Sequence, residues 1–524
     1  MGKLTGFLEY DRKTADECCA QERIQNWDAF HPAQSAAEIE QQAARCMNCG
    51  VPFCHAGVSW RGVGSGCTLG NLIPEWNHLV FKGHFEEAYR RLEKTNLLHE
   101  CTSRVCPALC EGACTCGMNG EPVAIREVER FLSDMAWENG WVVPRMPKER
   151  IDKSVAVVGS GPAGLTAAHV LNQRGFAVTV FEKSEEPGGL LMFGIPNMKL
   201  PKERIRQRVE ILRQEGITFV CNTDVGKDLP VTALDKFDAV LLCGGAGQPR
   251  DLSISGRNLP GVRFAVPFLA DATRMVLRGE TEEKPLAGRK VVVIGGGDTG
   301  NDCVATSIRM GANSVIQLEI MPPAPETRAQ DNPWPRWPLV LKTDYGQQEA
   351  IWLYGRDPRT FEITAVSIIG NENSGVTAIE TAEVEWVTTE RGRMPKQIES
   401  TIRRQPATDV LIAMGFVGAE TYLPGALNIT LDKTTYATSR PGVFAAGNVL
   451  HVHDLVDFVS EEAAVAGRAA ADYVAANCAD GDRRNVPVTF EGGPRYTVPS
   501  VVDPAHIKDR LTVRFRVGSV LKNQ

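Results

Sequence analysis

The sequence KSVAVVGSGPAGLTAAHVLNQRGFAVTVFEK, residues 153–183, decides the fold class of this chain. A short apolar strand leads into a glycine-rich turn, an alanine-rich helix follows, and a second apolar strand ends in an acid. Gly159, Gly161 and Gly164 have the spacing that lets the backbone turn tightly and approach a pyrophosphate at the helix N-terminus. Glu182 lies 18 positions after the last glycine, where an acid binds the hydroxyls of an adenosine ribose. The stretch therefore predicts a Rossmann-like dinucleotide fold.

The same pattern recurs in GRKVVVIGGGDTGNDCVATSIRMGANSVIQLEI, residues 288–320, where an apolar strand leads into Gly295, Gly297 and Gly300. Two dinucleotide folds in one chain predict two nucleotides, one that brings hydride and one that receives it. Because another strand of this kind follows the second fingerprint, we expect the first domain to be interrupted by the second and to resume near residue 410. The further apolar strands that run into glycine are FDAVLLCGGAG (237–247), TDVLIAMGF (408–416) and RPGVFAAGN (440–448).

Upstream of both fingerprints the chain is rich in cysteine, since eleven of its fifteen cysteines lie in the first 116 residues. Short gaps between cysteines, with Cys-Pro and Gly-Cys steps, are typical of iron–sulfur ligation, because each iron takes a thiolate and a short loop supplies three of them. The sequence therefore predicts iron–sulfur ligation in this region. The cysteine-rich stretches are CMNCGVPFC (46–54), GCTLGNLIPEW (66–76) and CTSRVCPALCEGACTC (101–116).

Two other uses of these cysteines stay open on the residues alone. Structural zinc usually takes two CxxC pairs, whereas this region has one such pair, Cys46 and Cys49, followed by wider gaps. A disulfide framework is unusual in a long chain without a secretory leader, since such a chain is expected in a reducing compartment. Iron–sulfur ligation is the favoured interpretation.

Helical patterns surround the cysteine loops. Residues 33–46 are rich in helix formers and predict a helix that presents Cys46 at its end. Residues 75–96 carry apolar positions at three- and four-residue spacing, and residues 123–140 predict a further helix that Gly140 ends. These helices and cysteine loops predict a compact α-helical module.

Composition excludes several classes of function. The chain of 524 residues is 43% hydrophobic and 23% charged, which is ordinary for a globular protein. Its net charge of −7 and its lack of a basic tract give no case for nucleic-acid binding. The N-terminus MGKLTGFLEYDRK has no apolar core of a signal peptide, and no apolar run is long enough to span a bilayer. We therefore expect a cytoplasmic protein.

With these residues in view, the chain resembles the small (β) subunits of bacterial glutamate synthases, a family of FAD and iron–sulfur NAD(P)H oxidoreductases. A similar module occurs in dihydropyrimidine dehydrogenase. The similarity extends from Gly6 to about residue 445. Its motifs are RCMNCGVPFCH (45–55), GNLIPEWN (70–77), RVCPALCEGAC (104–114), VVGSGPAGL (157–165), GGLLMFGIPNMKL (188–200), VVVIGGGDTGNDC (291–303), NPWPRWP (332–338) and LIAMGF (411–416).

The resemblance implies an α/β fold in which an N-terminal α-helical iron–sulfur domain precedes two Rossmann-like three-layer domains. These would bind FAD and NAD(P)H, with the second domain inserted in the first. The expected boundaries are 1–150 for the iron–sulfur domain, 151–285 and 409–475 for the two parts of the FAD domain, 286–408 for the NAD(P)H domain, and 476–524 for a small β-type appendage.

The resemblance also implies two 4Fe-4S clusters with crossed ligation. Glu129 would occupy the position where relatives use a ligand other than cysteine, and Cys101 and Cys116 would be left over. The first cluster would be held by Cys46, Cys49, Cys54 and Cys114, and the second by Cys67, Cys106, Cys110 and Glu129.

The nucleotide sites follow from the same resemblance. The flavin would be the reactive centre, so no catalytic side chain is predicted. FAD would be bound by Gly159, Ser160, Gly161, Pro162, Ala163, Gly164, Glu182, Lys183, Gly189, Leu190, Gly447 and Asn448. NAD(P)H would be bound by Gly295, Gly297, Asp298, Thr299 and Gly300, with Arg309 and Arg328 as candidates for a 2′-phosphate.

The implied reaction carries hydride from NADPH to FAD and then single electrons through the two clusters to a large (α) subunit. That partner makes L-glutamate from glutamine and 2-oxoglutarate. Such amidotransferases use an N-terminal cysteine nucleophile, whereas Met1 is followed here by Gly2. We therefore expect one subunit of the synthase, with neither nucleic acid nor membrane as a partner.

Two positions leave details open. Glu319 lies 19 positions after Gly300, where an acid favours NADH, while the family mostly uses NADPH. We expect NADPH, with NADH as the alternative. Asn448 stands where an aspartate is usual for contacting the flavin nucleotide, and the segment that follows it resembles another branch of the pyridine-nucleotide oxidoreductases.

Other functions are also consistent with parts of this pattern. The same cofactors could serve a different acceptor, such as ferredoxin or another dehydrogenase. A disulfide reductase like thioredoxin reductase is disfavoured, because no CxxC lies beyond residue 116. A zinc-stapled nucleotide sensor would be the non-enzymatic alternative.

Overall fold

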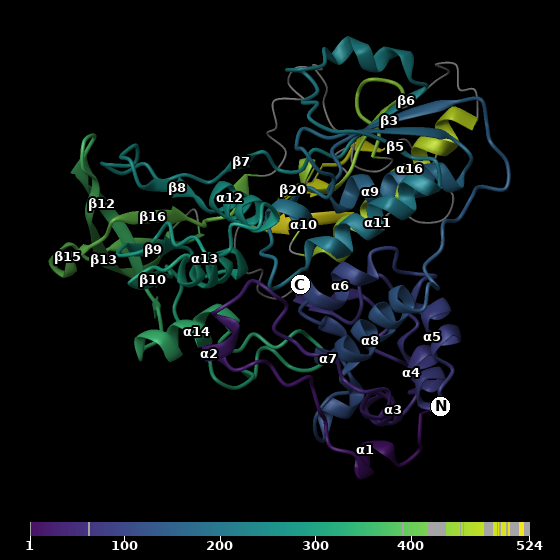
Figure 1. The fold of residues 1–524 in the computed structure, drawn as a ribbon, viewed down its shortest axis with the longest axis horizontal. Coiled ribbons are helices and arrows are strands. Elements are labelled where there is room, and N and C mark those ends of the chain that lie inside the picture. Colours follow the sequence, from purple (N-terminus) through teal and green to yellow (C-terminus); the bar gives the residue numbers. More distant parts are fainter. Residues whose placement is uncertain are drawn as a thin grey trace.

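The computed structural model of the protein has three lobes (Figure 1). The cysteine lobe contains helices α3 to α8, and each of the two nucleotide lobes is built on one parallel sheet. The described residues are 2–60, 63–389, 392–417, 436–450, 452–453, 455–475, 486–489, 491, 494–498, 501–502 and 513–517.

The cysteine lobe packs its helices around buried apolar side chains that include Trp76, Val80 and Leu132. Its first helix begins at a capping box, in which Ser35 and Glu38 exchange hydrogen bonds between side chain and backbone. The helical pattern over 75–96 is divided by Gly83, whose φ of +74° ends the first of two helices. The helices are α3 (Ala36–Ala44), α4 (Ile73–Phe81), α5 (Phe85–Leu92), α6 (His99–Val105), α7 (Leu109–Gly112) and α8 (Ile125–Glu138).

The first nucleotide lobe is a five-stranded parallel sheet in the order β18-β6-β3-β4-β5. Helix α9 (Pro162–Gln173) packs against α16 (Val456–Ala475), and α11 (Lys202–Gln214) contacts the cysteine lobe through α6. The apolar strand residues predict this burial, because both faces of a parallel sheet are covered. The strands are β3 (Ser154–Val158), β4 (Ala177–Phe181), β5 (Thr218–Val220), β6 (Ala239–Leu242) and β18 (Val443–Ala445).

The second nucleotide lobe is a five-stranded parallel sheet in the order β11-β10-β9-β16-β8. Val291 and Val293 of β9 belong to a core shared with helices, whereas Val292 and Ile294 belong to a core shared with an antiparallel sheet. The lobe therefore has three layers: helices, the parallel sheet and the antiparallel sheet. The parallel strands are β8 (Val262–Phe264), β9 (Lys290–Ile294), β10 (Ser314–Leu318), β11 (Arg359–Thr360) and β16 (Asp409–Ile412).

The outer layers of this lobe are also formed by continuous stretches of the chain. The helices are α12 (Ala265–Leu277), α13 (Asp298–Arg309) and α14 (Tyr345–Tyr354). The antiparallel strands are β12 (Ile363–Asn371), β13 (Gly375–Thr389), β14 (Gly392–Gln397) and β15 (Arg403–Pro406).

Two of the expected domain boundaries are wrong in detail. All strands of the second sheet lie between β6 and β18 in the sequence, so the second lobe interrupts the first. However, β8 pairs with β16, and β16 pairs with β9, so the strands at residues 262–264 and 409–412 belong to the second lobe and not to the FAD domain. The sequence of a short strand does not show which of two parallel sheets the strand will join, because its partners are distant in sequence.

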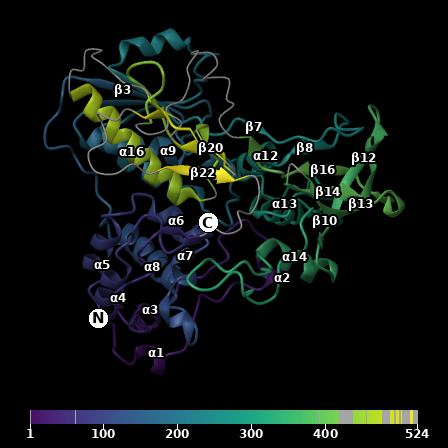
Figure 2. The ribbon, with the colours of Figure 1, turned by 180° about the vertical axis from the view of Figure 1, so that it is seen from behind.

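The N-terminal boundary also differs from the expected domain of residues 1–150. The segment of residues 17–31, here called the N-terminal arm, contains α2 (Ala20–Arg23). Its side chains Ile24, Trp27 and Phe30 are buried in the core of the second nucleotide lobe. Figure 2 shows α2 beside α14, away from the helices of the cysteine lobe.

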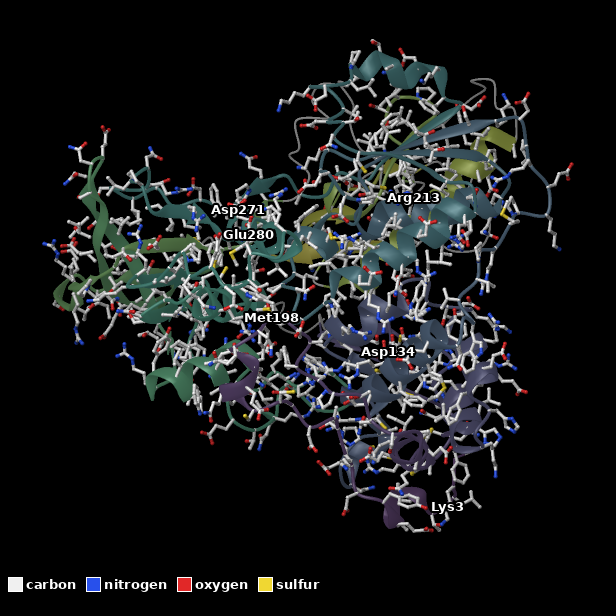
Figure 3. The ribbon with its side chains drawn as sticks, viewed as in Figure 1. Lys3, Asp134, Met198, Arg213, Asp271 and Glu280 are labelled. Carbon is white, nitrogen blue, oxygen red and sulfur yellow. The ribbon has the colours of Figure 1, made fainter. Side chains whose placement is uncertain are left out.

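The three lobes meet at a common junction. Figure 3 shows Met198 between them, and this side chain is 1% exposed. Asp134 of α8, also labelled in Figure 3, pairs with Arg104 at 2.6 Å and with Arg204 of α11 at 3.0 Å. Across the same boundary Arg208 of α11 forms a buried pair with Glu100 of α6 at 2.9 Å. These contacts fix the cysteine lobe against the first nucleotide lobe.

The remaining elements are short. Within the described part of residues 476–524, β19 (Val486–Pro487) pairs with β21 (Val501–Val502), and β20 (Pro494–Val498) pairs with β22 (Arg514–Val517). No helix among the described residues has the length and apolar character to cross a membrane. The other elements are α1 (Gly6–Glu9), β1 (Val58–Trp60), β2 (Val63–Ser65), α10 (Leu190–Phe193), β7 (Gln248–Pro249) and β17 (Phe416–Val417).

Candidate functional site

The first glycine fingerprint forms the turn between β3 and α9. Gly159 has a φ of +97°, a conformation that glycine adopts without strain. A Cβ at Gly164 would lie 1.9 Å from the carbonyl oxygen of Gly159, so only glycine allows the helix to begin this close to the strand. A Cβ at Gly161 would have no atom within 4 Å. The turn is therefore tight on its inner side and open at Gly161, where a phosphate could approach the helix N-terminus.

The predicted acid lies at this turn. Glu182 is 4% exposed, and its Oε2 accepts hydrogen bonds from the backbone N of Ser160 at 3.0 Å and from its Oγ at 2.5 Å. The Ser160 Oγ in turn accepts from the backbone N of Gly188 at 3.0 Å. A Cβ at Gly189 would lie 2.8 Å from the Cα of Gly161. Ser160 thus brings the GGLL segment of residues 188–191 onto the fingerprint, as a common nucleotide site requires.

The returning strand β18 completes the same site. A Cβ at Gly447 would lie 2.9 Å from the Cβ of Ala163, and the Gly447 backbone N donates to Glu462 of α16 at 2.7 Å. The Oδ1 of Asn448 accepts from the backbone N of His453 at 3.1 Å. Asn448 therefore shapes the approach to α16. Lys183 and Leu190 lie at the exposed rim of the turn.

The second fingerprint repeats this geometry between β9 and α13. Gly295 has a φ of +127°, and a Cβ at Gly300 would lie 2.2 Å from the Gly295 carbonyl oxygen. Gly297 faces open space, and Asp298 and Thr299 begin the helix beside it. The turn therefore has the form of a second nucleotide site.

An acid also lies at the second turn. A Cβ at Gly296 would lie 1.6 Å from Oε2 of Glu319, and Oε1 of this residue accepts from the backbone N of Met321 at 2.8 Å. Glu319 is thus placed at the glycine turn as Glu182 is at the first one. The sequence prediction that an acid follows each fingerprint agrees with this arrangement.

Arg309 is not available to bind a 2′-phosphate. It lies at the C-terminal end of α13, at the opposite end of the helix from the glycine turn, and is 1% exposed. Its guanidinium pairs with Glu349 at 2.6 Å and donates to the backbone oxygens of Arg23 and Asn26 at 2.9 Å. The sequence interpretation was wrong because a charged residue near a fingerprint does not reveal whether its donors are used within the core.

Arg328 is also engaged within the protein. Its Nη1 donates to the backbone oxygens of Asn332 at 3.1 Å and Arg336 at 2.6 Å. With this nitrogen it holds the loop of residues 332–338. Of the two arginines proposed from the sequence, Arg309 is thus excluded as a phosphate ligand, and Arg328 has one guanidinium nitrogen bonded to backbone oxygens.

The first predicted cysteine set comes together at the end of α3 and after α7. Burial raises the pKa of Cys54, and the nearby groups of Cys114, Cys46 and Cys49 raise it further. A hydrogen bond from Cys116 is the main cause that lowers the pKa of Cys114. We call Cys46, Cys49, Cys54 and Cys114 the first cysteine group. Cys116 is a fifth thiol beside it, and its Sγ lies 3.5 Å from the backbone oxygen of Arg45.

The second predicted set lines one pocket between the cysteine lobe and α16. Cys67, Cys106, Cys110 and Glu129 all line this pocket, and we call them the second cysteine group. Burial raises the pKa of Glu129 to about 8, and its Oε1 accepts hydrogen bonds from Thr102 at 2.6 Å and Asn96 at 3.2 Å. The carboxyl group is therefore a buried part of the pocket wall. Glu129 is therefore not a solvated side chain on the surface of its helix.

Asp457 is a pocket residue that the sequence did not single out. It comes from the first turn of α16, is 4% exposed, and its Oδ2 lies 3.2 Å from the Sγ of Cys106. No local motif predicts this contact, because the two residues are 351 positions apart in the sequence. The available signal was Asp457 itself, the second aspartate of the segment HVHDLVDF (451–458).

The donor chemistry of both groups fits iron–sulfur ligation. Each group combines buried cysteine thiols from more than one segment, as cluster ligation requires. No trio of His, Cys, Asp or Glu side chains among the described residues is spaced to hold a single metal ion. A cluster takes thiolates on separate irons, so its ligands lie further apart than those of one ion. The leftover Cys101 is buried in the core of the first nucleotide lobe, away from both groups.

Two family models match successive parts of the chain. The family described as dihydropyrimidine dehydrogenase domain II, 4Fe-4S cluster, matches residues 23–141. The pyridine nucleotide-disulphide oxidoreductase family matches residues 153–334. Among solved structures, Mycobacterium tuberculosis FprA in complex with NADPH has 19% sequence identity and a TM-score of 0.47, covering 63% of this chain and 85% of that one.

Curated relatives match over most of the chain. The glutamate synthase (NADPH) small chain of Bacillus subtilis is 43% identical over 474 residues, which cover 88% of this chain and 96% of the relative. The corresponding small chain of Mycobacterium tuberculosis is 40% identical, with coverages of 90% and 94%. The glutamate synthase (NADH) of Schizosaccharomyces pombe is 42% identical over 87% of this chain, which spans 22% of that protein. The resemblance inferred from the sequence is confirmed, and the chain belongs to the glutamate synthase small-chain family.

Proposed function

We propose that this protein is the electron-input subunit of an NADPH-dependent glutamate synthase. The observation that carries the proposal is the position of helix α16. Its residue Glu462 hydrogen-bonds the backbone of Gly447 at the first nucleotide turn, and its residue Asp457 lies against Cys106 in the second cysteine group. One helix therefore joins a nucleotide site to a cysteine site. Such contact is needed where electrons pass between two centres.

The residues described above would hold four groups. FAD would lie at the first glycine turn, NADPH at the second, and a 4Fe-4S cluster at each cysteine group. Bound there, the flavin and the clusters would supply the hydride and single-electron chemistry that side chains lack. The chain's own part is to present backbone N–H groups at Gly161 and Gly297, to place the acids Glu182 and Glu319, and to bury the thiols.

The partner in this proposal is the large chain of glutamate synthase, which makes L-glutamate from L-glutamine and 2-oxoglutarate in the cytoplasm. The names of the relatives in Bacillus subtilis and Mycobacterium tuberculosis support it, because both are small chains of an NADPH enzyme. The Schizosaccharomyces pombe relative, in which the matching stretch is part of a longer glutamate synthase, supports a close association of the two activities.

NADPH is the proposed donor, although Arg309, one of the two arginines expected to select it, is engaged in the core. Relatives named for NADPH and for NADH both match this chain. Glu319 is the side chain at the second turn that would disfavour a 2′-phosphate. Glu319→Ala is therefore expected to raise the ratio of kcat/KM for NADPH to that for NADH.

An anaerobic titration of the purified protein tests the proposal. Flavin, iron and sulfide are counted first, and NADPH is then added while the visible spectrum is recorded. One FAD and about eight irons per chain, with bleaching on NADPH, are expected from two 4Fe-4S clusters. Zinc in place of iron, or flavin without iron, would overturn the cluster assignment.

The acceptor is tested separately with the large chain. Mixing the two chains is expected to give NADPH oxidation that depends on both L-glutamine and 2-oxoglutarate. Ferredoxin is tested as an alternative acceptor in the same assay. The reason is that relatives outside glutamate synthase also match, since the putative oxidoreductase AegA of Escherichia coli is 33% identical over 88% of this chain. Electron transfer to ferredoxin that exceeds transfer to the large chain would favour that alternative.

A further inference from the structure

The segment NPWPRWP, residues 332–338, leaves the second nucleotide lobe and contacts the cysteine lobe. We call it the tryptophan loop. It follows β10 and precedes α14, and both of these elements belong to the nucleotide lobe. The backbone N of Trp337 donates to the backbone oxygen of Gly64 at 2.9 Å, and the Oγ of Ser65 donates to the backbone oxygen of Pro335 at 2.9 Å. The loop is therefore bonded to a lobe other than its own.

Hydrogen bonds within the second nucleotide lobe fix the shape of the tryptophan loop. Arg328 bonds two of its carbonyl oxygens, at Asn332 and Arg336. The side chain of Asn332 closes the loop, because its Nδ2 donates to the backbone oxygen of Trp337 at 3.1 Å and its Oδ1 accepts from the backbone N of Leu339 at 3.0 Å. These bonds explain why Arg328 and Asn332 accompany the two tryptophans in the sequence.

Trp334 lies against the first cysteine group. Its Nε1 donates to the backbone oxygen of Cys114 at 3.3 Å. Its ring packs against Phe53, with centroids 4.9 Å apart and planes tilted by 60°. Phe53 directly precedes Cys54, so the aromatic pair lies against both stretches that supply the first cysteine group, residues 46–54 and the one that contains Cys114.

Trp337 seals the neighbouring turn. A Cβ at Gly112 would lie 3.0 Å from Cε3 of Trp337 and 3.1 Å from Cδ of Pro338. This leaves no space for a larger residue between α7 and the loop. Cys110 and Cys114 lie on either side of Gly112, so the loop packs against the backbone that carries one ligand of each cysteine group.

We propose that Trp334, with Phe53, is the cover of the first cysteine group and keeps water from the cluster held there. The inference rests on the proposed function, because it needs a cluster at that group. A cluster with four thiolates gains negative charge on reduction, and water stabilises the more charged form. Excluding water therefore lowers the reduction potential of this cluster, and removing the cover raises it.

The test compares Trp334→Ala and Trp334→Phe with the wild type, all purified without oxygen. Trp352→Ala is the matched control, because Trp352 is 48% exposed on the nucleotide lobe. The midpoint potential of each cluster is measured by EPR-monitored titration, and the loss of iron is followed after exposure to air. Flavin content and the rate of flavin reduction by NADPH are measured on the same samples.

The Trp334→Ala protein is expected to lose about half of its iron several-fold faster than the wild type, with a raised potential of one cluster only. Trp334→Phe keeps an apolar ring but loses the bond to Cys114, so its iron loss should lie in between. Flavin reduction and Trp352→Ala should match the wild type.

Equal iron loss and equal potentials in Trp334→Ala and the wild type would overturn the cover and leave the proposed function intact. If the wild-type protein contained no iron, both the proposed function and the role of Trp334 as a cover would be overturned. If Trp334→Ala does not assemble its clusters, Trp334→Phe decides, since its rate of iron loss must then exceed the wild-type rate.

Discussion

The guanidinium of Arg309 makes five hydrogen bonds inside the protein, and three of them go to backbone oxygens. Its acceptors at Arg23 and Asn26 belong to the N-terminal arm, while Glu349 belongs to α14. One side chain thus joins three segments that are far apart in sequence. Its charge serves packing between segments, although its position near a fingerprint suggested a ligand.

Arg309→Met is therefore expected to lower the free energy of unfolding by about 3 kcal/mol, because it leaves the buried Glu349 carboxylate with only Arg23 as an ionic partner. The measurement is urea-induced unfolding compared with the wild type. Arg289→Met is the control, since the Arg289 side chain is 51% exposed and pairs with Asp409 at 3.7 Å. A changed preference between NADPH and NADH with unchanged stability would contradict this role.

His99 provides a pH-dependent prediction at the same scale. Burial lowers the pKa of His99 to about 4, whereas an unfolded histidine has a pKa of about 6.5. Its Nδ1 lies 2.8 Å from Ser133 Oγ, and its Nε2 lies 3.2 Å from Nη2 of Arg208, which suits a neutral ring. Between these two pKa values the unfolded state binds the extra proton, so the stability contribution of His99 falls as the pH falls.

We expect the stability advantage of the wild type over His99→Gln to shrink by about 1.4 kcal/mol per pH unit between about pH 6.5 and 4. Urea unfolding at several pH values in this window measures it. His84→Gln, a change at an exposed histidine, should show no such trend. A constant difference between wild type and His99→Gln across the window would show that His99 does not titrate as described.

At the scale of elements, the strand–turn–helix units distinguish glycines that differ in purpose. A Cβ at Gly164 would lie 1.9 Å from the carbonyl oxygen of Gly159, whereas a Cβ at Gly161 would meet nothing within 4 Å. Gly164→Ala is expected to prevent the first nucleotide lobe from folding. Gly161→Ala should fold but weaken FAD binding by roughly tenfold, because a methyl group would occupy the space of the pyrophosphate.

Flavin content and circular dichroism separate the two outcomes. Gly300→Ala and Gly297→Ala should behave in the same way toward NADPH, since their Cβ positions repeat the two environments. A Gly164→Ala protein with full flavin content would refute the packing argument.

The elements also show how far sequence reasoning extends. The fingerprints, their acids and the helix α8, which ends at Glu138 just before Gly140, were predictable, because each depends on residues within about 30 positions. The sheet that the strands at Val262 and Asp409 join was not predictable, since their hydrogen-bond partners lie elsewhere in the chain. The contact between Asp457 and Cys106 was not predictable for the same reason.

At the scale of the whole molecule, the two nucleotide lobes are joined by a buried polar cluster. Nζ of Lys199, from the loop after α10, lies 3.2 Å from Oδ1 of Asp302 in α13. The hydroxyl of Tyr345 donates to the same carboxylate oxygen at 2.7 Å. These three residues come from both lobes, so the cluster helps to set how the second glycine turn faces the first lobe.

Lys199→Met is expected to slow the reduction of bound flavin by NADPH by roughly tenfold without changing the flavin content, because hydride transfer depends on the relative position of the two sites. Stopped-flow absorbance at saturating NADPH measures this rate. Lys290→Met, at an exposed lysine on the same lobe, is the control. An unchanged rate in Lys199→Met would show that the lobes are positioned by other contacts.

The N-terminal arm and the tryptophan loop have a joint consequence for inheritance. The arm, although it precedes both cysteine groups, buries Trp27 and Phe30 in the second nucleotide lobe, and the tryptophan loop returns from that lobe to Cys114. The N-terminal region and the second nucleotide lobe thus each contribute a segment that packs in the other. If recombination replaced residues 1–150 with those of a distant relative, the hybrid would carry a foreign arm, and its cysteine lobe would lack the tryptophan loop that matches it. We therefore expect residues 1–150 to be inherited together with the second nucleotide lobe.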